Sequence, residues 1–178
     1  MLLEISVGVI IVCLLRLLVP LTIFKYPLWG TVASLIIDGL DVVIAFFLGA
    51  TNMEGYHNID KVLDVYYLSF AFLVSMKWDK MAKITSMSLF IYRIIGVILF
   101  EITQIRLFLF IFNNLFENFF IFEAARQKYF PKFKLTVKRL VIALLILLIP
   151  KMIQEYILHY LELKPAVWMG TKLGLIKS

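Results

Sequence analysis

The residues best suited to chemistry are aspartates within or beside apolar stretches of the chain. Asp38 and Asp41 lie three residues apart, and Asp60 and Asp64 lie four residues apart. Either spacing places the two carboxylates of a pair on one face of a helix. Like charges at such spacings repel each other unless a proton, a cation or an arginine lies between them. The pattern therefore predicts a site that holds positive charge.

Other polar residues lie in similarly apolar surroundings. An ionisable group at membrane depth costs at least about 2.5 kcal/mol, so such groups usually face a bundle interior or a water-filled cavity. Arg16 and Arg93 could balance the aspartates. We expect one interior polar site made of Arg16, Asp38, Asp41, Asp60, Asp64, Arg93, Glu101, Asn113 and Glu117. The alternative is a structural network, in which acids and arginines pair only to hold helices together.

The composition of the chain requires a bilayer around these residues. Hydrophobic residues make up 62% of the 178 residues, and the mean hydropathy is +0.95. A helix needs about 20 apolar residues to cross a membrane, which leaves room for about six crossings and no separate soluble domain. The predicted fold is an all-α, polytopic integral membrane bundle of about six transmembrane helices. It forms a single transmembrane domain over residues 1–178.

The spans are predicted from six apolar stretches of the sequence. They cover residues 2–24, 28–50, 62–76, 84–105, 107–125 and 135–163. Arg16 belongs to the first stretch, and Asp38 and Asp41 belong to the second. The fourth and fifth stretches abut, which predicts either a tight hairpin or one broken helix. Pro150 and Lys151 interrupt the apolar sequence of the sixth.

Lysines and arginines gather between the predicted spans. Because such charges stay on the cytoplasmic side, the connections at residues 77–83 and 126–139 should be cytoplasmic in a multi-pass membrane protein. The loop around Gly55 would then lie outside. Residues 126–139 serve either as a topological anchor or as a site for anionic lipids. The net charge of +6 does not indicate nucleic-acid binding, because the basic residues gather at helix ends.

A longer pattern runs through the aspartates. Asp38, Asp41, Ala45, Gly55, Asp60 and Asp64 resemble the signature of the CDP-alcohol phosphatidyltransferase family. The sequence departs from that signature at Val42, where the family has glycine, and at Phe46, where it has arginine. One extra residue separates Gly55 from Asp60. The family's acidic site opens to the cytoplasm, whereas the basic residues here predict that the Gly55 loop lies outside.

The resemblance implies six transmembrane helices and a divalent-metal site. Asp38, Asp41 and Asp60 would hold Mg²⁺, Mn²⁺ or Ca²⁺, and Asp64 would act as the general base. Hard cations of this kind prefer carboxylate oxygens and can bridge a pyrophosphate.

Three functions stay open at the level of the sequence, and with them the question of whether the chain is an enzyme. The first is a channel or transporter that passes a cation, a proton or a small charged solute along the acid-lined interior. The second is a metal-dependent, CDP-alcohol phosphotransferase-like enzyme of lipid synthesis. The third is a non-catalytic subunit of a larger membrane complex. The lipid bilayer is the partner expected in every case, and a homo-oligomer is compatible with each.

Overall fold

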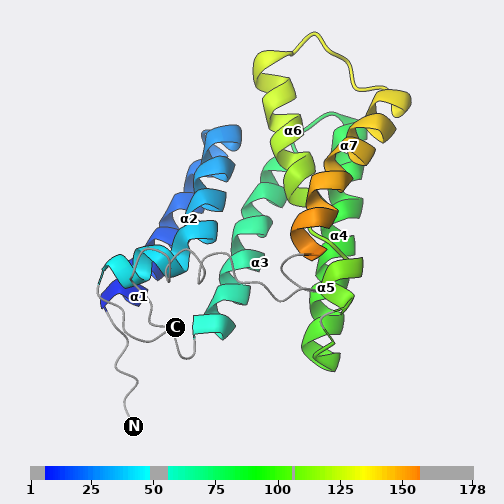
Figure 1. Ribbon diagram of the computed structural model, residues 1–178. Helices are drawn as coiled ribbons and strands as arrows, with labels where there is room; N and C mark the ends of the chain where they lie inside the picture. The colour runs from blue at the N-terminus through cyan, green and yellow to red at the C-terminus, as the bar shows by residue number, and fades with distance from the viewer. Residues whose placement is uncertain (1–6, 49–55, 106, 157–178) are drawn as a thin grey trace. The chain divides into compact units, whose positions relative to one another are not determined.

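A computed structural model describes residues 7–48, 56–105 and 107–156, and every regular element in these residues is a helix (Figure 1). The predicted all-α class is therefore confirmed for this part of the chain. In order, the helices are α1 (Val7–Leu18), the 3₁₀ helix η1 (Val19–Phe24), α2 (Pro27–Phe47), α3 (Tyr56–Ser75), α4 (Lys80–Thr103), α5 (Leu107–Ile111), α6 (Leu115–Tyr129) and α7 (Val137–Glu155).

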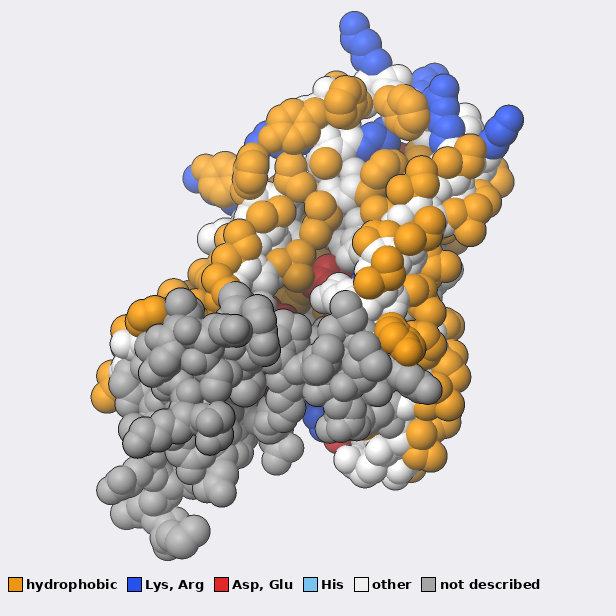
Figure 2. All heavy atoms as spheres, in the orientation of Figure 1, with side chains coloured by type: hydrophobic (Ala, Val, Ile, Leu, Met, Phe, Trp, Pro, Cys, Tyr) orange, Lys and Arg blue, Asp and Glu red, His pale blue; other side chains and the backbone are white. Residues whose placement is uncertain are grey.

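Three helical stretches of the described residues are long and apolar enough to cross a membrane. They are Val7–Phe24, Lys80–Thr103 and Leu107–Tyr129. Large hydrophobic side chains also cover much of the visible outer surface (Figure 2). Extensive apolar exposure of this kind suits lipid rather than water. A count of six crossings and a multi-pass topology stay predictions.

The chain forms two compact units, with the division inside α3 between Phe70 and Ala71. Unit 1 contains α1, η1, α2 and most of α3. Unit 2 contains the last turn of α3 and the helices from α4 to α7. A single transmembrane domain over residues 1–178 stays a prediction.

In unit 1, close packing of α1 and η1 on α2 fixes the position of Arg16. Val12 and Ala45 are fully buried between α1 and α2. A Cβ at Gly8 would lie only 2.3 Å from the carbonyl oxygen of Ala45, so only glycine lets the helices approach this closely. After Arg16 the α-helix gives way to η1 around Pro20, because proline has no N–H to donate to a preceding turn.

In unit 2, the chain turns sharply between α4 and α5 and then breaks again before α6. Gln104 ends α4 in a left-handed conformation, with a φ of 57°. The boundary between the fourth and fifth predicted spans is therefore a hairpin. The break in helical structure lies inside the fifth stretch, at residues 112–114, between α5 and α6. Helix α7 runs through Pro150 without ending.

Candidate functional site

Arg16 lies at the centre of a carboxylate cluster in unit 1. Its Nη1 donates to Asp41 at 3.1 Å, and its Nη2 donates to Asp64 at 2.5 Å. The same guanidinium also pairs with Asp38 through Nη2 and with Asp60 through Nη1. One cation from α1 thus contacts two carboxylates from α2 and two from α3. The structure brings together these five members of the predicted polar site.

Helical periodicity and one contact between helices explain how the four carboxylates converge. Helix α3 begins at Tyr56, so Asp60 and Asp64 lie one turn apart on the same helix. Asp38 and Asp41 are related in the same way on α2. The hydroxyl of Tyr66 donates to the carbonyl oxygen of Leu17 at 3.1 Å, which holds α3 beside the segment that carries Arg16. Gly55, predicted to precede this site, lies outside the described residues.

The cluster has a closed side and a more open side. The side chains of Arg16 and Asp41 are 5% and 10% exposed. Those of Asp38, Asp60 and Asp64 are 39%, 32% and 41% exposed. The cluster is therefore more accessible from the side of these three carboxylates.

The same three carboxylates have the spacing of a metal site. One oxygen each from Asp38, Asp60 and Asp64 lies within 4.8 Å of the other two. Oxygens that ligate one Mg²⁺ or Ca²⁺ lie about 2 to 2.6 Å from the ion, so opposite ligands are about 4 to 5 Å apart. The family resemblance implied Asp41 in place of Asp64 in this set. A cavity of about 10 Å³ beside Arg16 and Asp38 has room for about one water molecule.

Arg93 supports the break between α5 and α6 in unit 2. Its Nη1 donates to the carbonyl oxygen of Phe112 at 3.1 Å, and the hydroxyl of Tyr92 donates to that of Ile111 at 2.6 Å. These are carbonyls at the end of α5, where the helical hydrogen bonds stop. A Cβ at Gly96 would lie 2.1 Å from the Cβ of Phe112, so glycine lets the broken segment approach α4. Pairing of Arg93 with an aspartate stays a prediction.

Glu117 and Asn113 face α7 at the same break. Glu117 accepts a hydrogen bond from Asn114 at 3.3 Å and lies 3.5 Å from the ammonium group of Lys151. Asn113 donates to the sulfur of Met152 at 3.3 Å. Glu117 and Lys151 are 7% and 4% exposed, so they form a buried ion pair between α6 and α7. The sequence signal for this pair was the presence of Lys151, a charged residue, within the sixth apolar stretch.

The predicted polar residues thus fall into two groups, one in each unit. Arg16 and the four aspartates form the group in unit 1, and Arg93, Glu101, Asn113 and Glu117 belong to unit 2. Glu101 lies exposed near the end of α4, where its backbone carbonyl accepts a hydrogen bond from Gln104 at 2.9 Å. A single site that unites all nine residues stays a prediction.

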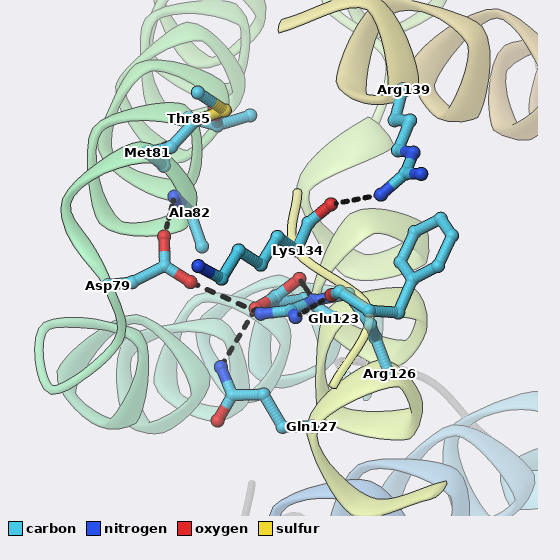
Figure 3. A network of polar contacts seen from close by, with 10 residues as sticks. Asp79, Met81, Ala82, Thr85, Glu123, Arg126, Gln127, Lys134 and Arg139 are labelled. Atoms are coloured by element: carbon cyan, nitrogen blue, oxygen red, sulfur yellow. Dashed lines mark hydrogen bonds and ion pairs between the residues drawn. The ribbon is translucent and has the colours of Figure 1, made fainter. Parts of the chain in front are cut away.

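A third polar network, centred on Arg126, was not predicted (Figure 3). Arg126 forms two hydrogen bonds with Glu123, at 2.8 and 2.6 Å, and reaches Asp79 at 3.1 Å. Asp79 also caps α4, because its other oxygen accepts from the backbone N–H of Ala82 at 3.1 Å. Arg126 was expected to belong to a topological anchor or to a site for anionic lipids. The acid three residues before it, Glu123, was the signal for a structural role.

No protein-family model matches the sequence, and no curated protein or solved structure matches it. The resemblance to the CDP-alcohol phosphatidyltransferase signature stays a prediction from the sequence.

Proposed function

We propose that this chain is an integral membrane channel or transporter for a cation, a proton or a small charged solute. The carboxylate cluster around Arg16 would be its binding point. The observation that supports the proposal is the ratio of charges, because four carboxylates from α2 and α3 contact a single guanidinium. A guanidinium stays protonated in proteins and neutralises one carboxylate. Protons or a bound cation can neutralise the others.

The arrangement also suits reversible binding. An arriving cation would compete with Arg16 for oxygens that the guanidinium already contacts. Such competition weakens the binding of the cation, and conduction requires binding that is favourable enough for entry and weak enough for release. Arg16 would then act as a built-in competitor that keeps the affinity moderate. The more exposed carboxylates, Asp38, Asp60 and Asp64, would meet the cation first.

A metal-dependent CDP-alcohol phosphotransferase is the second candidate. It is favoured by the mutual spacing of the oxygens of Asp38, Asp60 and Asp64, which would suit one divalent cation. These three aspartates and Asp41 are the ones that the family signature contains. A metal held there would neutralise a pyrophosphate and polarise it toward attack. The resemblance gives the metal instead to Asp38, Asp41 and Asp60, and in that arrangement Asp64 would take the proton of the attacking hydroxyl.

Reconstitution of the purified full chain in liposomes tests the leading proposal. Flux of H⁺, Na⁺, K⁺ or Mg²⁺ is expected, and Asp38→Asn or Asp41→Asn should abolish it while the protein stays folded in detergent. Asp79→Asn is the matched control. It removes one carboxylate charge from another network, and asparagine still caps a helix.

A parallel assay separates the two candidates. The same preparation is incubated with CDP-alcohols, an alcohol acceptor and Mg²⁺ or Mn²⁺, and the release of CMP is measured. CMP release without ion flux would replace the transport proposal with the enzyme. Neither flux nor CMP release would reject both and favour the non-catalytic subunit of a membrane complex.

A further inference from the structure

The ion pair between Asp79 and Arg126 brings two basic connections to the same end of unit 2. Asp79 lies between α3 and α4, and Arg126 lies in the last turn of α6. Arg126 Nη1 also donates to the carbonyl oxygen of Phe133 at 2.5 Å, which ties the connection between α6 and α7 to the same point. Residues 77–83 and 126–139 together hold nine basic residues and one acidic residue, Asp79. Their positive charge is therefore concentrated in one place.

Most of this charge is directed outward. Arg126 is only 8% exposed and is paired with Glu123 and Asp79, so it adds little positive charge to the surface. Figure 2 shows lysine and arginine side chains gathered and projecting at the end of unit 2 where α6 and α7 are joined. The exposed lysines of the two connections include Lys77, Lys80, Lys132, Lys134 and Lys138.

Aromatic side chains are exposed among these lysines. Tyr129, Phe130 and Phe133 are 52%, 66% and 43% exposed. The guanidinium of Arg139 stacks over the ring of Phe133, 4.3 Å from its centre, and so keeps its charge beside an apolar group. Apolar rings interleaved with cations are typical of the boundary between lipid tails and headgroups. A surface made only to bind a soluble acidic partner would not need these rings.

The position of the surface along the helices agrees with that boundary. One stretch able to cross a membrane begins at Lys80, and another ends at Tyr129. Both ends belong to the connections that Asp79 and Arg126 hold together. If these helices cross the bilayer, the surface lies at the level of the headgroups.

We propose that this basic surface (Lys77, Lys80, Lys132, Lys134 and Lys138 with Tyr129, Phe130 and Phe133) binds the headgroups of anionic phospholipids. The ammonium groups would contact the phosphates, and the rings would enter the upper part of the acyl region. The proposal goes beyond the transport function and does not depend on it.

Native mass spectrometry of the purified full chain in detergent tests the proposal, with phosphatidylglycerol and phosphatidylcholine as probes. Phosphatidylglycerol should bind preferentially, and the preference should shrink as salt is added, because salt screens exposed charges. The variant with Lys132, Lys134 and Lys138 changed to Gln should lose about fivefold in affinity per lysine, or roughly a hundredfold together. The variant with Arg at the same positions is the matched control and should retain the preference.

Single substitutions keep the test decisive if the triple variant does not fold. Lys132→Gln and Lys138→Gln should each weaken binding of phosphatidylglycerol about fivefold. The double substitution Phe130→Ser and Phe133→Ser should weaken binding of phosphatidylglycerol and leave binding of inorganic phosphate unchanged. This result would separate a lipid site from a simple anion site. Equal binding of the two lipids, or an unchanged preference in the Gln variants, would overturn the proposal.

Discussion

Arg16 and Asp41 form the buried half of the carboxylate cluster, with Nη1 of the arginine 3.1 Å from Oδ2 of the aspartate. Their side chains are 5% and 10% exposed, whereas the other three carboxylates are between 32% and 41% exposed. The loss of the arginine would therefore leave charge stranded where solvent screens it least. The loss of one of the more exposed aspartates would leave Arg16 with three carboxylate partners.

Arg16→Gln should destabilise the protein by about 3 to 5 kcal/mol, because it leaves four neighbouring carboxylates without their shared guanidinium. Thermal unfolding in detergent measures the effect. Lowering the pH should restore part of the stability of this variant, since protons then neutralise the carboxylates. Arg139→Gln is the control, because that side chain is exposed. Equal losses from the two substitutions would contradict a central role for Arg16.

Divalent cations should raise the unfolding temperature of the wild-type protein. A ligand that binds only the folded state stabilises it by about 2.7 kcal/mol at a concentration of 100 Kd. Asp60→Asn should remove the stabilisation by Mg²⁺, Mn²⁺ or Ca²⁺, because Asp60 belongs to the set whose oxygens lie within 4.8 Å of one another. Asp79→Asn should leave it intact. A wild-type protein that shows no shift with any of these cations would exclude a divalent-metal site in this cluster.

The buried pair of Glu117 and Lys151 should behave as a unit. Glu117→Gln or Lys151→Met alone should cost about 3 to 5 kcal/mol, because each leaves a buried charge without its partner. The double substitution should cost less than the sum of the two single ones. Chemical unfolding of all four proteins gives the coupling energy. Strictly additive losses would show that the pair contributes no direct interaction.

Two glycines offer a matched test of the break between α5 and α6. In Gly96→Ala the new methyl group would clash with Phe112, because a Cβ at position 96 would lie 2.1 Å from the Cβ of that residue. Overpacking of this kind costs about 1 to 3 kcal/mol. Gly39→Ala places its Cβ where no other atom lies within 4 Å, so it should be neutral or stabilising by up to about 1 kcal/mol. Thermal unfolding compares them, and similar effects would argue against close packing at Gly96.

The orientation can be tested with single cysteines in a Cys13→Ser background. Cysteines placed at Lys80 and Lys132 should react with an impermeant reagent only from the cytoplasmic side, as the excess of basic residues predicts. Both should react from the same side, because Asp79 and Arg126 join their connections. Labelling of both from outside would reverse the orientation and bring the Gly55 loop to the cytoplasm, as the enzyme reading requires.

The pairing of Asp38 with Asp41 on one helical face, and of Asp60 with Asp64 on another, could be anticipated because it depends on local periodicity. Spacings of three and four residues fix which side chains share a helical face, whatever the packing. The assignment of Arg16 as a counter-charge followed from the energetic cost of an unpaired charge among apolar residues. The rank of the carboxylates by exposure depends on how α1, α2 and α3 pack, and the sequence does not contain that information locally.

The features that were missed depend on contacts between distant segments. The break at residues 112–114 has no proline or glycine to announce it, and the side chains that support it, Tyr92 and Arg93, come from α4. Arg126 lies among other basic residues at the end of a predicted span, as a topological charge would. Only the folded structure shows that it pairs with Asp79, 47 positions earlier in the sequence. Lys151 stood out in an apolar stretch, but nothing in the sequence paired it with Glu117.

The 3₁₀ helix η1 has a consequence for the depth of Arg16. A 3₁₀ helix rises about 2.0 Å per residue and an α-helix about 1.5 Å, so α1 and η1 together extend about 30 Å, close to the thickness of the hydrocarbon core. If this stretch crosses the bilayer, Arg16 lies about 14 Å from one end, near the midplane. A cation or proton that reaches Arg16 from either surface would cross roughly half of the membrane voltage. The free energy with which the cluster binds a singly charged cation would thus change by about 1 kcal/mol for each 100 mV applied.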